Sequence, residues 1–172
     1  MGNIKVPALI DDVVCAENEA GVRTIHLIGE DDLTYPLPAV DADTRTISTD
    51  LVLIDAAAAG FEEWKYLEGT GIHTENSNDN SLYDHLVELI VPGDSAIKRY
   101  TFDCMTRGCS KFAAIYTDEN GVQKFVDKLS FSYEYTTGRG GSNNDRNQYT
   151  LRFTKSGAAA FIYTGTVPVK TP

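Results

Sequence analysis

Alternating apolar and polar residues in the second half of the chain predict one long, half-buried β-strand. Its apolar face carries large residues, Leu129, Phe131, Tyr133 and Tyr135. Its other face carries small or acidic residues, Ser130, Ser132 and Glu134. Tracing the apolar face backward leads to the charged Asp127, so the alternation slips there and predicts a β-bulge.

The sequence DENG at 118–121 precedes this strand and predicts a hairpin turn. Asn120 and Gly121 tolerate the positive φ angles that tight hairpins need. Residues 111–117 would form the first strand of that hairpin. Residues 147–154, with Tyr149, Leu151 and Phe153 on one face, and residues 159–167 predict two further strands.

The first half of the chain predicts shorter strands at 22–29, 45–54 and 61–67. Residues 82–91 fit both a helical stripe and a strand alternation, but the short length and the closing Pro92-Gly93 favour a strand. Residues 73–81 have almost no apolar content and are expected to form a flexible loop or the tip of a long hairpin.

Residues 94–107 predict a helix. Asp94 is placed to accept hydrogen bonds from the free amides of the first turn. The face expected to pack on the sheet is the stripe Ile97, Tyr100, Thr101 and Cys104. Arg107 suits the helix C-terminus, and Gly108 is expected to end the helix in the left-handed conformation.

Together these elements predict a mainly β (α+β) fold, an antiparallel β-sandwich or barrel-like domain with one flanking α-helix. The 172 residues are enough for one domain, spanning 1–172, with its own hydrophobic core. A hairpin tip is expected near 73–81, and a loose C-terminal tail is expected at 166–172.

The net charge of −10, from 25 acidic and 15 basic residues, argues against a sequence-specific reader of nucleic acids. No apolar run approaches the length of a membrane span, and the first residues lack the apolar core of a signal peptide. The 3 cysteines are odd in number and scattered, which favours synthesis in a reducing cytoplasm.

The sequence carries no local motif of a catalytic or metal-binding site. Its 3 histidines stand in no metal-binding spacing: His26, His73 and His85. Cys104 and Cys109 form no CxxC pair, and the GRGG run at 138–141 lies between strands rather than at a helix N-terminus. We therefore expect no enzyme, catalytic residue, cofactor or metal, while calcium binding by the acidic turns stays open.

Several short features follow one another in a set order along the second half. An Asp-Asn-Gly turn precedes the long strand: Asp118, Asn120 and Gly121. A Thr137-Gly138 step then leads into the next strand through Asp145, Asn147 and Tyr149. This order resembles the tail tube proteins of bacteriophages, particularly those of phages and prophages of Bacteroides-type bacteria. The opening, with Cys15, Asn18 and Gly21, is similar too, whereas Val126-Asp127 replaces a glycine that often begins the long strand.

The resemblance implies a structural virion protein, a subunit of a tail tube or tube-like ring that self-assembles through sheet edges and conducts DNA. It implies a homo-oligomeric ring, with hexameric symmetry as one arrangement, and other phage tail proteins as partners. DNA would be only non-specific passing cargo, repelled by an acidic lumen, and no membrane would be involved. The protein would be made in the cytoplasm of a bacterial host and reside in the virion.

The same resemblance marks candidate assembly residues in two segments. The candidate assembly strand and turn comprise Asp118, Asn120, Gly121, Ser130, Ser132 and Glu134. The candidate inter-ring loop comprises Glu75, Asn76, Asn78 and Asp79.

Two alternatives remain open from the residues. Trp64, Tyr66 and the many tyrosines would also suit a soluble carbohydrate- or peptide-binding β-sandwich. Another phage particle protein, such as a capsid decoration or tail-completion subunit, would share the β-rich build.

Overall fold

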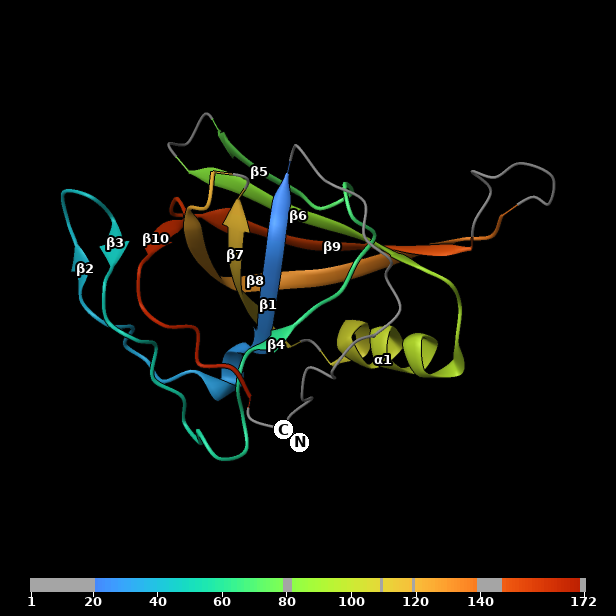
Figure 1. Ribbon diagram of the computed structural model, residues 1–172, viewed down its shortest axis with the longest axis horizontal. Helices are drawn as coiled ribbons and strands as arrows, with labels where there is room; N and C mark the ends of the chain where they lie inside the picture. Colours follow the sequence, from blue (N-terminus) through green and yellow to red (C-terminus); the bar gives the residue numbers. More distant parts are fainter. Residues whose placement is uncertain (1–20, 79–81, 109, 119, 139–146, 171–172) are drawn as a thin grey trace.

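The computed structural model describes residues 21–78, 82–108, 110–118, 120–138 and 147–170. Within these ranges the protein is mainly β with a single α-helix, as the sequence predicts (Figure 1). The strands are β1 (Val22–Gly29), β2 (Val40–Asp41), β3 (Thr46–Ile47), β4 (Glu62–Glu63), β5 (Ile72–Ser77), β6 (Tyr83–Pro92), β7 (Phe112–Asp118), β8 (Gln123–Thr136), β9 (Gln148–Gly157) and β10 (Phe161–Tyr163). The helix α1 spans Ala96–Arg107, and a 3₁₀ turn spans Glu30–Asp32.

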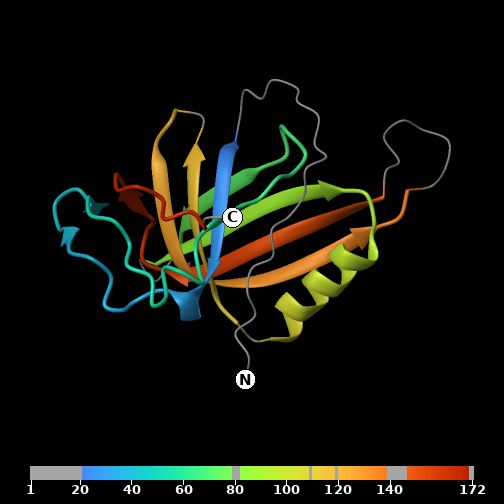
Figure 2. The same ribbon diagram turned by 60° about the horizontal axis from the view of Figure 1, so that its bottom comes forward.

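Strand β8 belongs to two sheets. The first sheet has the order β2-β3-β10-β8-β7-β1-β4, and its β10–β3 pair is parallel. The second sheet has the order β5-β6-β9-β8 and is antiparallel throughout. Residues 123–129 of β8 pair with β7 and residues 130–136 pair with β9, so β8 crosses from one sheet into the other (Figures 1 and 2).

The predicted β-bulge is confirmed and lies where β8 changes sheet. Phe112 pairs with Leu129 and Ala114 pairs with Val126, which leaves two residues of β8 opposite one residue of β7. Those two residues are Asp127 and Lys128, and Lys128 has a φ of 59°. A bulge bends its strand and increases the local twist, so β8 can serve both sheets.

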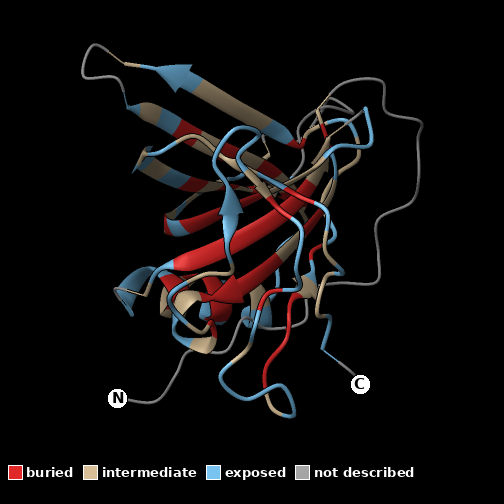
Figure 3. Ribbon diagram, turned by 90° about the vertical axis from the view of Figure 1, so that its left-hand side faces the viewer, coloured by how far each residue is buried: buried red, intermediate tan, exposed pale blue. Residues whose placement is uncertain are grey.

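The main hydrophobic core lies between the two sheets and α1. Its largest members are Trp64, Phe102, Phe112, Tyr116, Tyr149 and Phe153. The buried residues follow the central strands (Figure 3). The alternation predicted for β6 and β9 is confirmed, because Val87, Leu89 and Val91 are buried together with Tyr149, Leu151 and Phe153.

A second core covers the outer face of the first sheet. It contains Ile28, Leu33, Ile47, Leu51, Phe61, Ala113, Ile115, Phe125 and Tyr163. Residues of β7 alternate between the two cores, which explains why the run FAAIY is apolar without interruption.

Three predicted strands are much shorter in the structure. Segment 45–54 contains only β3, segment 61–67 contains only β4, and segment 159–167 contains only β10. Much of the chain around 33–54 lies across the first sheet as an irregular layer. Some of its backbone amides donate to groups outside any strand ladder; Leu51 N–H, for example, donates to the Tyr163 hydroxyl (3.2 Å). In segment 45–54, Ile47 and Leu51 are buried but Thr49 is exposed, and local alternation carries no information on whether a neighbouring strand is there to pair with.

The segment 73–81 is largely strand rather than loop. Residues 73–77 lie in β5 and pair with β6, so the hairpin interpretation is the correct one. The strand prediction for 82–91 is confirmed by β6, Tyr83–Pro92.

The predicted helix is present, but of the stripe predicted to face the core only Thr101 is buried. Ser95, not Asp94, caps its N-terminus by accepting from Lys98 N–H (3.2 Å). The buried residues are Thr101, Phe102 and Met105, whereas Ile97 and Tyr100 are 77% and 74% exposed. Phe102 buries a large ring among core aromatics, which outweighs the stripe expected from spacing. Gly108 ends the helix with a φ of −70°, so the left-handed ending was also wrong.

The segment expected as a loose tail is held against the domain through residue 170. Phe61 N–H donates to the Pro168 carbonyl (2.9 Å), and Lys170 N–H donates to the Phe61 carbonyl (3.2 Å). Thr166 N–H donates to the Asp50 carboxylate (2.6 Å). Residues 171–172, like Asp79 and Asp145, lie outside the described residues.

Candidate functional site

The second sheet buries one face and leaves the other polar. The helix α1 lies against the inner face (Figure 2). Phe102 of this helix contacts Tyr133 and Tyr149 there. The outer face of its three longer strands carries Asp84, Leu86, Glu88, Ile90, Ser130, Ser132, Glu134, Thr136, Gln148, Thr150, Arg152, Thr154 and Ser156. These residues are half-buried or exposed, whereas most inward residues of β6 and β9 are buried and those of β8, Phe131, Tyr133 and Tyr135, are half-buried. We call this surface the open face.

An ion network crosses the open face at its centre. Arg152 on β9 donates through Nε to Glu88 on β6 (2.8 Å) and through Nη1 to Glu134 on β8 (3.2 Å). The three longer strands carry three carboxylates on this face, those of Asp84, Glu88 and Glu134. Their one guanidinium on the face is that of Arg152. Lys111 reaches the margin and donates to the Ser130 hydroxyl (2.5 Å). The described strands of the open face are therefore acidic on balance.

Both sides of the second sheet end in edge strands. Among the described strands, β5 pairs only with β6, and residues 130–136 of β8 pair only with β9. Each edge therefore presents a row of main-chain N–H and C=O groups without a strand partner, which is the template for adding a strand from another chain.

The candidate assembly turn is confirmed as a turn. The Asp118 carboxylate accepts from the amides of Asn120 (3.0 Å) and Val122 (2.9 Å), and Gly121 has a φ of 77°. The turn lies at the start of β8, whereas Ser132 and Glu134 lie near its other end on the open face. The structure therefore places the predicted assembly residues in two separate regions.

The candidate inter-ring residues also divide between different surroundings. Glu75 points inward and accepts from Ala160 N–H (3.2 Å), so it is not the free loop residue that was predicted. Asn76 lies on the exposed side of β5, and Asn78 lies at the hairpin tip, where its side chain accepts from Leu82 N–H (3.1 Å).

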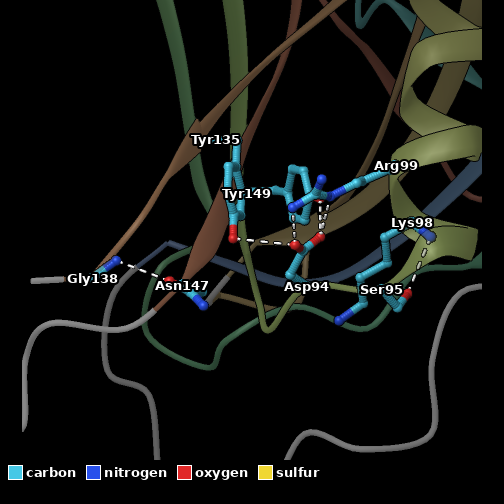
Figure 4. A network of polar contacts seen from close by, with 8 residues as sticks. All are labelled: Asp94, Ser95, Lys98, Arg99, Tyr135, Gly138, Asn147 and Tyr149. Atoms are coloured by element: carbon cyan, nitrogen blue, oxygen red, sulfur yellow. Dashed lines mark hydrogen bonds and ion pairs between the residues drawn. The ribbon is translucent and has the colours of Figure 1, made fainter. Parts of the chain in front are cut away.

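A polar network fastens the start of α1 to the β8–β9 hairpin (Figure 4). The Asp94 carboxylate accepts from Arg99 Nε (2.9 Å), Tyr149 Oη (2.5 Å) and Tyr135 Oη (3.3 Å). Nearby, Gly138 N–H donates to the Asn147 side chain (2.9 Å), which closes the base of the hairpin. Hydrogen bonds from Arg99 and Tyr149 hold the pKa of Asp94 well below its usual range.

This network predicts an acid-dependent part of the protein's stability. Because the pKa of Asp94 is lower in the folded state, its carboxylate stabilises the fold above the ordinary value of 3.8, and this contribution is lost as pH falls below that value. Asp94→Asn is therefore expected to lower the free energy of unfolding, relative to the wild type, by more at about pH 6 than at about pH 3. Urea unfolding at both pH values measures it.

Asp103→Asn is the matched control for this prediction. Asp103 pairs with Arg107 (2.6 Å) on the same helix, but both side chains are exposed, so the substitution is expected to have little effect at either pH. A deficit of Asp94→Asn that stays constant or grows toward low pH would contradict the assigned role of Asp94.

A tyrosine-lined groove lies beside the same network. Its volume is about 360 Å³, and its lining residues are Arg99, Tyr100, Asp103, Tyr133, Tyr135 and Tyr149. Trp64, by contrast, is 1% exposed and belongs to the core, and the Tyr66 hydroxyl donates to the Val22 carbonyl. Neither of these two residues therefore supports the ligand-binding alternative for which they were named.

The structure also brings together a cluster that local spacing did not reveal. The side chains of His73, Glu75 and His85 have potential ligand atoms all within 4.8 Å of one another. Burial, with Lys124 nearby, lowers the pKa of His73 to about 4, so this ring is neutral at neutral pH. Only the β5–β6 register could have revealed the cluster, since residues 73 and 85 are far apart in sequence. His26 lies on β1 opposite Glu63, outside this cluster.

The fold and the open face together define a mainly β domain with one flanking helix and two free sheet edges. Comparison of the chain with protein-family models, curated proteins and solved structures found no match. Across the described ranges, the helices are too short or too polar to cross a membrane.

Proposed function

We propose that the protein is a structural virion subunit of a phage tail tube or tube-like ring, which self-assembles through sheet edges and conducts DNA. The observation that carries the proposal is the second sheet, with its two free edges and its open polar face. The order of sequence features described above agrees with this role.

The geometry of the edges permits head-to-tail assembly into a ring. Neighbouring strands in the order β5-β6-β9-β8 are antiparallel, so the two edge strands run in opposite directions. The β8 edge of one copy could therefore join the β5 edge of the next copy and continue the antiparallel order. The two edges differ, so this contact is heterologous, and a heterologous contact with a closing rotation generates a ring.

The chemistry of the open face suits the lining of a DNA conduit. Serine and threonine hydroxyls and an excess of carboxylates cover most of it, beside the half-buried Leu86 and Ile90, and the whole chain has a net charge of −10. Such a surface repels phosphates and offers few cations to bind them, so DNA would pass as non-specific cargo. The remaining partners would be other phage tail proteins in the virion, after synthesis in the cytoplasm of a bacterial host.

A single proline tests the role of the β5 edge. Asn78 N–H donates to the Leu82 carbonyl (2.7 Å), which marks a hydrogen-bonded pair, so the alternating pattern directs Ser77 N–H away from β6. Ser77→Pro removes this outward donor while leaving the β5–β6 ladder intact. We expect it to raise the concentration needed for ring or tube formation by at least about tenfold. Negative-stain microscopy and sedimentation measure this concentration.

Ser77→Ala keeps the N–H group and is the matched control, expected to assemble like the wild type. Circular dichroism should show both variants folded. A wild-type protein that stays monomeric at every concentration would overturn the proposal. Unchanged assembly of a folded Ser77→Pro variant would exclude pairing through β5.

The tyrosine groove favours a second candidate function, the binding of a carbohydrate or peptide. Tyr100 is 74% exposed beside Tyr133 and Tyr135, and aromatic faces of this kind can stack on sugars. Saturable binding on a glycan array, abolished by Tyr100→Ala in a strictly monomeric protein, would favour this candidate over the tube subunit.

A further inference from the structure

The β5–β6 hairpin register places three metal-ligating side chains on one face. Glu75 pairs directly with His85 across the two strands. His73 lies two residues before Glu75, and strand residues two apart share a face. The rings of His73 and His85 lie 6.0 Å apart between centroids at an interplanar angle of 30°.

The surroundings of His85 point to a ligand. The side chain is 2% exposed, and its Nε2 lies 2.8 Å from the Ala158 carbonyl oxygen. A carbonyl can only accept, so Nε2 carries the proton and Nδ1 keeps a free lone pair. That Nδ1 is buried and, among the described side chains, is one of two buried polar atoms without a hydrogen-bond partner. Histidines that bind metals typically donate the other ring N–H to a carbonyl or carboxylate in this way.

The side chains of His73 and Glu75 are also held in place, but each keeps a lone pair with which it can bind a metal ion. The Tyr116 hydroxyl lies 3.0 Å from Nε2 and 3.1 Å from Nδ1 of His73, and its one proton can serve only one of these nitrogens. Glu75 accepts from Ala160 N–H through Oε1 (3.2 Å), which leaves lone pairs on both carboxylate oxygens.

Neighbouring positive charge is largely neutralised. Lys155 pairs with His85 across β6 and β9, but its ammonium is bound by the Asp127 carboxylate (2.6 Å). Lys124 similarly lies near Asp118 (3.6 Å). Both cations therefore already have a carboxylate partner.

We propose that His73, Glu75 and His85 form a binding site for a divalent transition-metal ion of the zinc type. Two imidazole nitrogens and one carboxylate oxygen are a ligand set that suits zinc and cobalt, with a further position for water. Bonds of about 2.0–2.2 Å would bring the ligand atoms closer together than the 4.8 Å within which they now lie. The ion would fasten the edge strand β5 to β6 beside Tyr116 of the first sheet.

Metal titration of the full-length protein, after chelator treatment, tests the site. Calorimetry with zinc chloride is expected to show one saturable ion per chain, and cobalt should give visible absorption without the sulfur charge-transfer bands of cysteine. His73→Gln and Glu75→Gln are each expected to weaken binding at least about tenfold. A hundredfold excess of zinc over Kd should raise Tm by roughly 5–10 °C.

His26→Gln is the matched control, because His26 lies on β1 outside the cluster, and it should bind metal like the wild type. His73 and Glu75 are half-buried, so both variants should stay folded, which circular dichroism checks. A wild-type protein without saturable binding would overturn the proposal. So would metal affinity that is unchanged in folded His73→Gln and Glu75→Gln.

Discussion

Phe131→Asp is expected to lower the free energy of unfolding by about 3–5 kcal/mol, whereas Ser132→Asp at the next position should change it by less than about 0.5 kcal/mol. The Phe131 ring lies within 6.2 Å, between centroids, of the rings of Phe102, Phe112 and Phe153. Removing it opens a cavity among these aromatics, and the new carboxylate must either lose its hydration or move the strand.

Urea unfolding followed by circular dichroism measures both changes. Position 132 is exposed on the open face, so the carboxylate introduced by Ser132→Asp stays in water. It would disturb only a partner surface. The loss expected for Phe131→Asp is a large part of the total stability of a typical domain, about 5–15 kcal/mol. A native-like Phe131→Asp protein with unchanged thermal melting would refute the face assigned to this strand.

Asp127→Ala is expected to destabilise the protein by about 3 kcal/mol, because it leaves Lys155 buried without its counter-ion. The ion pair measures 2.6 Å, and the exposed fractions of the Lys155 and Asp127 side chains are only 16% and 9%. The pair links β9 to the bulge at which β8 changes sheet, so the substitution also loosens the junction between the sheets.

The double variant Asp127→Ala/Lys155→Met distinguishes an unpaired charge from lost packing. It removes both charges while keeping a long apolar side chain, so it should recover much of the stability lost by Asp127→Ala. Equilibrium unfolding in urea compares the three proteins. Asp127→Ala with wild-type stability, or a double variant no better than the single one, would contradict this account.

The long strand shows how much local pattern can predict. Its two faces, the slip at Asp127 and the turn at Gly121 all follow from side-chain alternation and turn chemistry within a short window. The structure confirms each of them. The helix shows the limit of such reasoning. Several faces of α1 carry apolar residues, and helical spacing alone predicted that Ile97 and Tyr100 would face the core. The space left between Trp64 and Tyr149 admitted Phe102 instead.

The candidate sites depended still more on distant contacts. The free edges of the second sheet follow from which strands pair, and no window of sequence contains that information. The cluster of His73, Glu75 and His85 arises from the register of one hairpin, together with burial against β7 and the Ala158 carbonyl.

The sequence by itself determined the mainly β class, the presence of one helix, the bulge and the inward faces of β6, β8 and β9. These features depend on φ/ψ preferences and on alternation between neighbours, which act within a few residues. The tertiary structure alone decided the helix face, the irregular second layer, the two open edges and the histidine–glutamate cluster. Strand order, register and the shape of the core set these features, and each is a property of residues brought together from distant parts of the chain.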